Sequence, residues 1–185
     1  MSITTGGGDS GETGLLYGGR VSKDDLHTEA YGSLDEAISA LGLARALETN
    51  EARAQRLLAL QRELFVVGAE LATGVGFRGD LEKHFETVTS AMTDALHTEI
   101  RELEARVQLP KSFVIPGGSA SGAALDLART LVRRAERRAV ALQRARALEN
   151  PEVIRYLNRC SDLLFMLARE AEQGATVAAG DHRRG

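Results

Sequence analysis

Five arginines lie close together on one predicted helix, behind a glycine-serine loop, in the stretch from Val114 to Arg138. Three of them, Arg129, Arg133 and Arg137, recur every fourth residue, so their side chains lie along one face of that helix. Guanidinium groups at this density repel one another unless an anion lies among them, and each can hold a phosphate group through two hydrogen bonds. The spacing therefore predicts a surface that binds a polyphosphate.

The alternative for this helix is a solvent-exposed face with ordinary Glu-Arg pairs, each of which contributes a few tenths of a kcal/mol. The adjacent residues Arg133 and Arg134, and likewise Arg137 and Arg138, fit this alternative less well. Adjacent residues occupy different faces of a helix, so some of these arginines must point toward the bundle or toward a second subunit. Both interpretations stay open on this evidence.

A second candidate phosphate site is the glycine-rich N-terminal segment. Gly6, Gly8 and Gly11 have the spacing of the dinucleotide fingerprint, but neither the preceding strand nor the following helix that it requires is predicted here. Glycines still allow backbone N–H groups to approach phosphate oxygens. The alternative is a flexible terminus in which Lys23 is merely a solvated charge. Hydroxyl groups that could add to a phosphate site belong to Thr5, Ser10 and Thr13.

Two polar residues, Asn158 and Asp162, lie one turn apart among leucines on the last predicted helix. A buried polar group without a partner costs about 1 to 3 kcal/mol. A ligand, a bond to another helix or a position at the edge of the core would each satisfy them. Asp35, near the start of the first predicted helix, either favours the helix dipole or pairs with an arginine.

Other kinds of chemistry are disfavoured by the spacing of the reactive residues. The histidines are scattered, and the pair Asp94 and His97 has no second carboxylate-histidine pair of the kind that a di-iron bundle needs. Neither Cys160, the only cysteine, nor any serine has a histidine at a recognisable motif spacing. Catalysis must then come from positioning and electrostatics.

The composition indicates one helical domain. The chain has 185 residues, of which 43% are hydrophobic and only 4% aromatic, with no tryptophan. The 23 basic and 26 acidic residues give a net charge of -3, so nucleic acid is not an expected partner. No apolar run approaches the length of a membrane span, and a single cysteine fits a reducing compartment. We expect a cytoplasmic protein that does not enter the membrane.

Capping signals place the predicted helices. Ser33 with Glu36 forms a capping box that marks the first start, and Asn50 can cap the second helix. A third helix is predicted over residues 85–107, after a break at residues 74–79, and a β-like stretch over residues 113–115. Ser119 or Ser121 can cap the arginine helix, which is expected to end near Leu148; the signal Asn150-Pro151-Glu152 starts the last helix, which runs to about Gln173.

The predicted fold is thus all-α, a bundle of about five helices. We divide the chain into a glycine-rich segment over residues 1–27, a bundle over residues 28–173 and a tail over residues 174–185. The tail has nothing to bury and is expected to be mobile.

Four blocks of sequence resemble one known family in the right order and cover nearly the whole chain. They read GDSGETGLLYGGRVSKDD, EAYGSLDEAISALGLAR, FVIPGGSASGAALDLARTLVRRAERR and NPEVIRYLNRCSDLLFMLAR. The chain resembles the ATP:cob(I)alamin adenosyltransferases of the type associated with propanediol use and with human methylmalonic aciduria. The resemblance implies a five-helix bundle that assembles as a homotrimer, with active sites in the clefts between subunits.

The implied reaction moves the adenosyl group of ATP to reduced cobalamin and releases triphosphate. Cobalt in the +1 state is the nucleophile and attacks the ribose 5′ carbon, so the protein needs no nucleophile of its own. A corrinoid reductase and an enzyme that uses adenosylcobalamin are the further partners that such a reaction implies. The cofactor expected beside the two substrates is Mg²⁺, held mainly by the ATP phosphates, with Glu136 as the one carboxylate that could aid it.

The resemblance also implies roles for individual residues. Arg129 and Asp35 match a pair that bridges two subunits at the site, and Phe113 matches an aromatic residue beneath the corrin ring that removes the lower axial ligand of cobalt. Arg133 is the first candidate to stabilise the leaving triphosphate. The residues expected to bind ATP are Thr5, Gly6, Gly7, Gly8, Thr13, Gly14, Lys23, Arg133, Arg134, Glu136, Arg137 and Asn158.

One departure from the family pattern concerns the N-terminal loop. The family usually has a lysine or arginine after the first threonine, where this chain has Gly6. We therefore expect weaker contact between the loop and the triphosphate, and greater dependence on Lys23 and the arginine helix. Two alternative functions remain: a protein that holds and delivers adenosylcobalamin without efficient turnover, and a nucleotide-binding or structural bundle.

Overall fold

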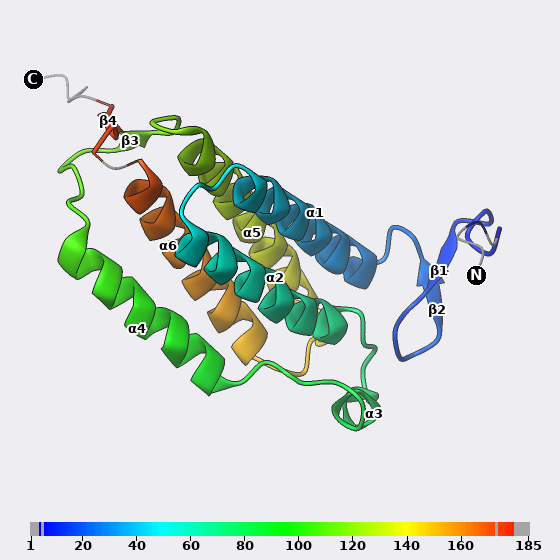
Figure 1. The fold of residues 1–185 in the computed structure, drawn as a ribbon. Coiled ribbons are helices and arrows are strands. Elements are labelled where there is room, and N and C mark those ends of the chain that lie inside the picture. Colours follow the sequence, from blue (N-terminus) through cyan, green and yellow to red (C-terminus); the bar gives the residue numbers. More distant parts are fainter. Residues whose placement is uncertain (1–3, 5, 173, 180–185) are drawn as a thin grey trace, which may run out of the picture.

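The structure is a computed structural model that describes residue 4, residues 6–172 and residues 174–179. Within this part of the chain five long helices and one short helix form a bundle, so the all-α prediction is confirmed (Figure 1). The helices are α1 (Leu26–Ala46), α2 (Glu51–Leu71), α3 (Arg78–Glu82), α4 (Ser90–Arg106), α5 (Ala120–Arg144) and α6 (Glu152–Ala171). Four short strands accompany them: β1 (Glu12–Gly14), β2 (Arg20–Ser22), β3 (Val114–Ile115) and β4 (Val177–Ala178).

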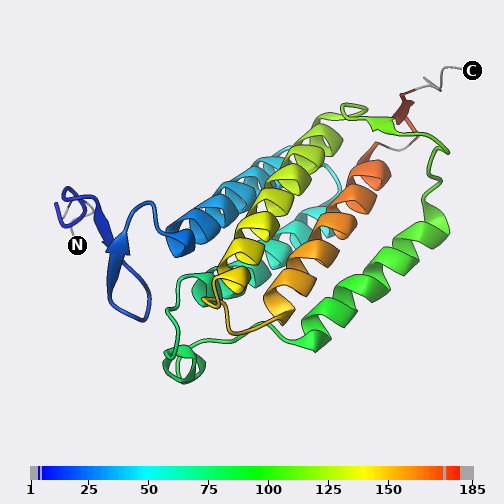
Figure 2. The same ribbon diagram turned by 180° about the vertical axis from the view of Figure 1, so that it is seen from behind.

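Helix α5 lies between α1 and α6, while α2 packs on α1 and α4 packs on α6 (Figures 1 and 2). Its buried stripe consists mainly of alanines, which let the neighbouring helices approach closely. Charged residues occupy the remaining faces of α5, so packing the stripe directs the arginines outward. The stripe residues are Ala124, Ala128, Val132, Ala135, Ala139 and Leu142, spaced at three or four residues.

Two of the predicted caps are confirmed and one is wrong. Asn50 accepts a hydrogen bond from the N–H of Arg53 at 3.0 Å, and Ser119 accepts one from Gly122 at 2.9 Å. The predicted start at Ser33 is wrong, because α1 begins at Leu26 and Ser33 is buried inside it. The actual cap is Asp25, whose side chain accepts a hydrogen bond from a backbone N–H in the first turn of α1. This cap lies earlier in the chain than the predicted capping box.

The predicted third helix begins five residues later than expected, at Ser90. Helix α3 is followed by a loop, and α4 begins only at Ser90, where the side chain of Thr89 caps it. Buried contacts hold this loop in a non-helical path: the N–H of Val88 donates to Glu70 at 2.6 Å, and the amide of Asn150 donates to both Glu70 and the Val88 carbonyl. A periodic apolar pattern over residues 85–107 could not reveal these contacts, which are distant in sequence.

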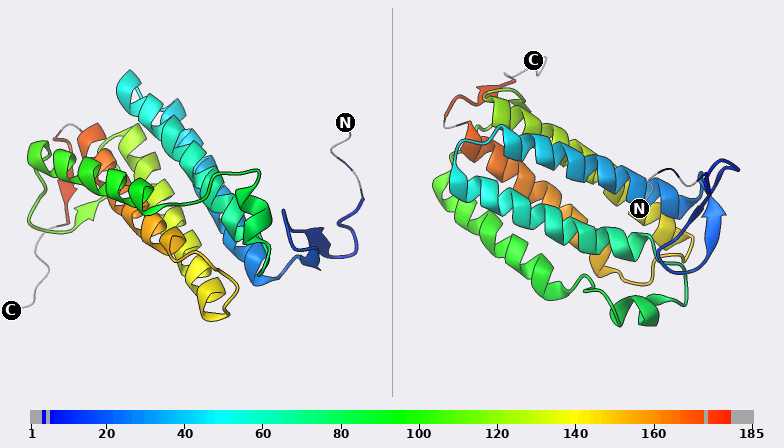
Figure 3. Two further views of the ribbon diagram at one scale, coloured as in Figure 1. Left: turned by 90° about the horizontal axis from the view of Figure 1, so that it is seen from below. Right: turned by 45° about the vertical axis from the view of Figure 1, so that its right-hand side comes forward.

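The N-terminal segment is a hairpin that stands off the bundle beyond the start of α1 (Figures 1 and 3). Strands β1 and β2 pair antiparallel, with Thr13 opposite Val21. The hairpin is attached where Leu16 donates to the Ala72 carbonyl at 2.9 Å and Gly74 donates to the Tyr17 carbonyl at 2.8 Å. Glycine-rich sequence alone predicted a loop here, and the strand pairing was missed.

The chain after α6 also differs from expectation over the residues that the structure describes. Residues 174–179 were assigned to a mobile tail, but β4 pairs antiparallel with β3, Val114 opposite Ala178 and Ile115 opposite Val177. The backbone N–H of Ala179 donates to the Phe113 carbonyl at 2.7 Å. Exposed side chains gave no sign of this pairing, because backbone groups make it. None of the helices in the described ranges has the length and apolar character of a membrane span.

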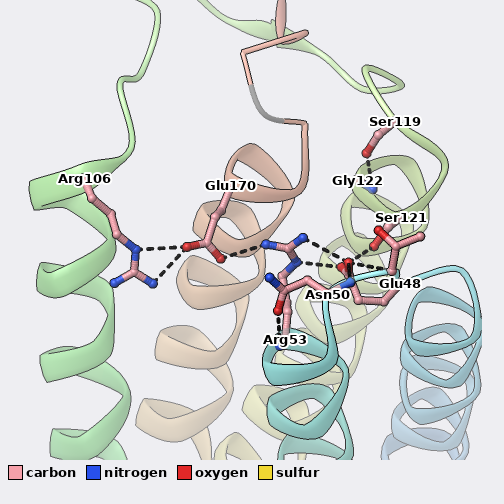
Figure 4. A network of polar contacts seen from close by, with 9 residues as sticks. Glu48, Asn50, Arg53, Arg106, Ser119, Ser121, Gly122 and Glu170 are labelled. Atoms are coloured by element: carbon pink, nitrogen blue, oxygen red, sulfur yellow. Dashed lines mark hydrogen bonds and ion pairs between the residues drawn. The ribbon is translucent and has the colours of Figure 1, made fainter.

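A buried polar network joins four helices at one end of the bundle (Figure 4). The carboxylate of Glu48 accepts hydrogen bonds from Arg53 at 2.6 and 2.9 Å and from the Ser121 hydroxyl at 2.8 Å. Arg53 also donates to Glu170, which pairs with Arg106. Burial raises the pKa of Glu48, but the hydrogen bonds from Arg53, the Asn50 backbone and Ser121 outweigh it and lower the pKa from 4.5 to about 2.

We expect Glu48→Gln to destabilise the protein near pH 7. A carboxyl whose pKa is depressed by folding adds stability above its unfolded pKa, and this is lost as the pH falls through its folded pKa. The wild-type advantage should therefore be about 3 kcal/mol near neutrality and shrink between pH 4.5 and 2. Denaturant unfolding across this range, at fixed protein concentration, measures it. Glu51→Gln, on the exposed first turn of α2, is the control; a difference independent of pH would contradict the expectation.

Candidate functional site

The arginines of α5 divide into two sets with different surroundings. Arg134 forms an ion pair with Glu36, and Arg138 pairs with Glu29 at 3.2 Å. Both glutamates lie on α1, so these two arginines help to join the helices. The interpretation as a face of ordinary ion pairs is therefore right for this set, and Arg134 already has a partner within the chain.

The second set lies on the other exposed face of α5. Arg133 and Arg137 are exposed and make no ion pair or hydrogen bond with any described residue. Two unpaired guanidinium groups one turn apart form a surface with an unbalanced positive charge. This is the part of the helix that is free to bind an anion.

Arg129 begins this second face and is half-buried. Its Nε lies 3.4 Å from a carboxylate oxygen of Asp126, and its guanidinium carbon lies 6.0 Å from the centre of the Phe165 ring. Asp126 also pairs with Arg169 on α6. The first arginine of the row is thus held in place by α6, whereas the later two are free.

The same packing places Asn158 at the level of the free arginines. Helices α5 and α6 run antiparallel, with Asp126 against Arg169 and Arg129 against Phe165. Two further turns along α6 bring Asn158 to the level of Arg137. Asn158 is exposed, and its side-chain oxygen accepts only a long 3.5 Å bond from Arg159. Asn158 is therefore not a buried polar group that needs a partner on another helix, and it is accessible to a ligand.

Glu136 is half-buried among the arginines and has no ion pair or hydrogen bond with the described residues. Asp162 is engaged by Arg159 at 2.9 Å. Within the described residues there is no group of three or more acidic, histidine or cysteine side chains that could hold a metal. One carboxylate beside a phosphate-binding surface is nevertheless a usual arrangement for Mg²⁺, which takes most of its ligands from phosphates and water.

Phe113 stands at the opposite end of this face. Its side chain is 88% exposed, the highest fraction among the large hydrophobic side chains that are described as exposed. It lines a pocket of about 270 Å³ together with Arg129, Phe165 and Arg169. An aromatic ring held in water beside a pocket offers an apolar surface to a ligand.

A groove of about 590 Å³ lies on a different face, between α1 and α2. Asp35 lies on its wall, and its other lining is mostly apolar, including Tyr31 and the exposed ring of Phe65. No ion pair of Asp35 occurs among the described residues. Asp35 and Arg129 therefore line separate cavities of one chain and do not pair within it.

The glycine loop, residues 6–8, precedes β1 of the hairpin and has two cationic side chains close to it. Arg20 donates to the Gly7 carbonyl at 2.8 Å, and the ammonium of Lys23 lies 3.0 Å from the point that a Cβ at Gly8 would occupy. Gly6 has a φ of +66°, a conformation in which the basic residue usual in the family would be strained. Sequence analysis missed Arg20, because only the register of β1 with β2 brings it back toward the loop.

The structure therefore brings together some predicted residues and separates others. Thr13 and Gly14 lie in β1, whereas Thr5 lies outside the described residues. The glycine loop stands beyond the start of α1, clear of the helices (Figures 2 and 3). One chain thus carries a glycine loop, an arginine face and an apolar groove as separate parts.

Among the described residues, the single cysteine is not an activated nucleophile. Cys160 is fully buried, and this burial raises the pKa of its thiol above the usual range, so the thiol stays protonated. The fold and site define a class of α-helical protein with a cationic face suited to a polyanion and an exposed aromatic ring beside a pocket suited to an apolar ligand.

Comparisons with known proteins agree with this class. The chain matches the family model for cobalamin adenosyltransferase over residues 3–171. It is 41% identical over 177 residues to the corrinoid adenosyltransferase of Citrobacter freundii, covering 96% of this chain and 98% of that protein. The corrinoid adenosyltransferase of Bacillus subtilis (strain 168) is 40% identical over 190 residues, covering 100% of this chain and 93% of that protein.

Solved structures give the same result. A variant of the PduO-type ATP:corrinoid adenosyltransferase from Lactobacillus reuteri, complexed with cobalamin and ATP, matches with a TM-score of 0.84 at 33% identity, covering 93% of this chain and 94% of that one. Another variant of that enzyme, complexed with ATP, matches with a TM-score of 0.82 at 33% identity, covering 92% and 94%. The chain belongs to the cobalamin adenosyltransferase family, and it is a transferase.

Arg169, a buried arginine that lines the Phe113 pocket, allows a test of how much its ion pairs stabilise the protein. Arg169 is the shared partner of Asp126 and Glu172, and its side chain is 1% exposed. Arg169→Met leaves two buried carboxylates without that partner and should cost about 3 to 5 kcal/mol in the free energy of unfolding. Arg106→Met, which removes an exposed pair with Glu170, should cost about 1 kcal/mol or less. Equal losses in urea unfolding would contradict this assignment.

Proposed function

We propose that the protein transfers the 5′-deoxyadenosyl group of ATP to cob(I)alamin and forms adenosylcobalamin and triphosphate. The Co(I) electron pair attacks the ribose 5′ carbon, a cobalt-carbon bond forms, and the bond from that carbon to the triphosphate oxygen breaks. Both electrons of the broken bond leave with triphosphate, and cobalt becomes Co(III). This step uses no side-chain nucleophile, in accord with the protonated, buried thiol of Cys160.

The unpaired arginines of α5 are the observation that carries this proposal. Arg134 and Arg138 are engaged by α1, while Arg133 and Arg137 stay exposed without a partner in the described chain. Triphosphate gains negative charge as it leaves, so guanidinium groups fixed beside it stabilise the transition state more than the ground state. Arg133 is the central group for this role, and Arg137 and Asn158 extend the surface along the nucleotide.

We place each active site between two subunits of a homotrimer. The glycine loop and the arginine face lie apart in one chain, and so do Asp35 and Arg129. A neighbouring subunit removes both separations. The N-terminal segment of that subunit brings Lys23 and the backbone amides of residues 6–8 to the phosphates. Its Asp35 contacts Arg129 of the first subunit. The apolar groove beside Asp35 then becomes part of the covered interface rather than an exposed surface.

The corrin ring lies against Phe113 in this proposal. The exposed ring of Phe113 is of a size and character to occupy the lower axial side of cobalt, where it excludes the nitrogen ligand. Removing an axial donor makes Co(II) easier to reduce, since the donor stabilises the higher oxidation state.

Mg²⁺ accompanies ATP in this proposal and supplies charge neutralisation on the phosphates. Glu136, a free carboxylate between the arginines, is the side chain suited to contact it or one of its waters. We further place the enzyme in the cytoplasm, where a reductase supplies cob(I)alamin and an enzyme that uses adenosylcobalamin receives the product.

The direct test is an anaerobic assay with chemically reduced cobalamin, ATP and Mg²⁺. The cob(I)alamin absorbance should disappear over many turnovers, with one triphosphate formed per adenosylcobalamin. A single round followed by retention of product would instead indicate a carrier, and consumption of ATP with release of diphosphate or phosphate would contradict the proposed bond cleavage.

We expect Arg133→Ala to lower kcat for adenosylation by about a hundredfold, because the site loses a charged donor to the leaving group. Arg138→Ala is the matched control, since Arg138 lies on the same helix and pairs with Glu29 on α1. Steady-state kinetics at saturating ATP measure the effect. If both variants lost activity equally, the division of α5 into a binding face and a structural face would be wrong.

Gly8→Ala should raise the KM for ATP about tenfold while leaving the folding stability almost unchanged. The new methyl group would lie 3.0 Å from the Lys23 ammonium and would displace it from the loop. Gly79→Ala is the control, because nothing lies within 4 Å of the corresponding position. A normal KM in Gly8→Ala would show that Lys23 does not act from this position.

A further inference from the structure

Glu172, at the end of α6, is a buried carboxylate that the proposed reaction does not use. Its side chain is 0% exposed and forms an ion pair with Arg169 at 3.0 Å. Oε1 also accepts a hydrogen bond from the backbone N–H of Gly118 at 3.1 Å, and Oε2 accepts one from the Thr176 hydroxyl at 2.5 Å. One carboxylate thus holds two loop segments that are 58 residues apart.

These two segments continue from one end of the strand pair, the end opposite Phe113. Gly118 follows β3, and Thr176 precedes β4. The pair itself is short and exposed, and its last bond runs from the Ala179 N–H to the Phe113 carbonyl at 2.7 Å. A two-residue ladder has little stability of its own, so its position depends on the segments that continue from it. Glu172 is the anchor of these segments, at the end where Ile115 pairs with Val177.

The packing around the anchor leaves no room for side chains. A Cβ at Gly118 would lie 2.8 Å from the Glu172 carboxyl carbon and 2.7 Å from the Ala175 carbonyl oxygen. A Cβ at Gly122 would lie 2.9 Å from Cγ of Glu172. The two glycines allow the start of α5 and the C-terminal segment to close on the same carboxylate.

The anchor also connects to Arg129. Arg169 bridges Glu172 and Asp126, and Asp126 contacts Arg129. Phe113 and Arg129 line one pocket, so the two sides of that pocket are fixed by one buried chain of charges. Charge-assisted bonds of this kind are short and directional, and they hold their members in one geometry.

We infer that Glu172 is a positioning residue for the adenosyl transfer: through Gly118, Thr176 and β4 it holds the loop that presents Phe113 to the lower face of the corrin. This inference rests on the proposed function. The side chain of Phe113 is 88% exposed and has almost no packing of its own, so only the backbone can set where the ring lies. When the carboxylate is lost, the loop samples other positions and the ring no longer keeps the lower ligand away from cobalt.

The test uses Glu172→Gln and the milder Thr176→Val in the full-length enzyme. The amide nitrogen of glutamine cannot accept the hydrogen bond that Oε2 accepts from Thr176, and the neutral side chain loses the ion pair with Arg169. Valine at position 176 removes only the hydroxyl. Glu172→Gln should lower kcat about tenfold, with a KM for ATP within about twofold of wild type. The fraction of enzyme-bound cob(II)alamin that lacks its lower ligand, read from its absorption and paramagnetic resonance spectra, should fall in both variants. Hydrogen exchange at the Ala179 amide should become faster.

A double variant that also carries Phe113→Ala distinguishes a positioning role of Glu172 from a general loss of structure. In the Phe113→Ala background Glu172→Gln should change neither kcat nor the ligand-free fraction further, because the ring it positions is gone. Glu48→Gln, which removes another buried carboxylate at an arginine, controls for lost stability and should leave the ligand-free fraction unchanged. A wild-type spectrum in Glu172→Gln, or losses that add to those of Phe113→Ala, would overturn the inference. A wild-type enzyme that forms no adenosylcobalamin would overturn the proposed function instead, and the exchange data would still report on the anchor.

Discussion

The packing of α5 between α1 and α6 is the constraint on which the site depends. Its buried stripe is built from small residues such as Ala128 and Ala135, so three helices approach closely and the rotation of α5 about its axis is fixed. That rotation decides which arginines meet the glutamates of α1 and which remain free. A helix with larger side chains on this stripe would stand further from α1, and the pairs of Arg134 and Arg138 could not form as they do.

In the proposed trimer, each chain supplies complementary parts of a site rather than a whole one. The glycine loop is displaced from the arginine face, and Asp35 lines a cavity separate from that of Arg129. Charges that face no partner within a subunit are costly to cover unless the neighbour supplies the opposite charge. In the proposed interface this makes the apolar groove selective, because Asp35 on its wall favours a neighbour that offers a cation there.

The sequence predicted the elements that depend on local signals. Helix periodicity, the caps at Asn50 and Ser119 and the β-like stretch at β3 follow from residues close in the chain. The errors have a common physical cause, because each involves partners far apart. Ser33 looked like a cap because nothing local shows that it is buried, and the path of the loop before α4 depends on Glu70 and Asn150.

The site shows the same limit. The arginine row and Phe113 could be identified from residue type, spacing and family resemblance, but the division of the arginines into paired and free sets required the glutamates of α1. Arg20 reaches the glycine loop only through the β1–β2 register, and β4 reaches Phe113 only through backbone bonds. Interactions of the backbone carry no signal in the side-chain pattern, so such partners could not be predicted.

In the proposed reaction, the exposure of Phe113 contributes to the free energy of corrinoid binding. Full burial of such a side chain stabilises a protein by about 1.5 to 3 kcal/mol, and this chain leaves the ring in water. That free energy becomes available only when an apolar surface covers the ring, so the binding of a flat macrocycle can offset the loss of its axial ligand. The exchange works only if the ring cannot fold back onto the protein. In our inference the buried carboxylate of Glu172, which holds Gly118 after β3 and Thr176 before β4, prevents that collapse and keeps the apolar surface directed at the ligand.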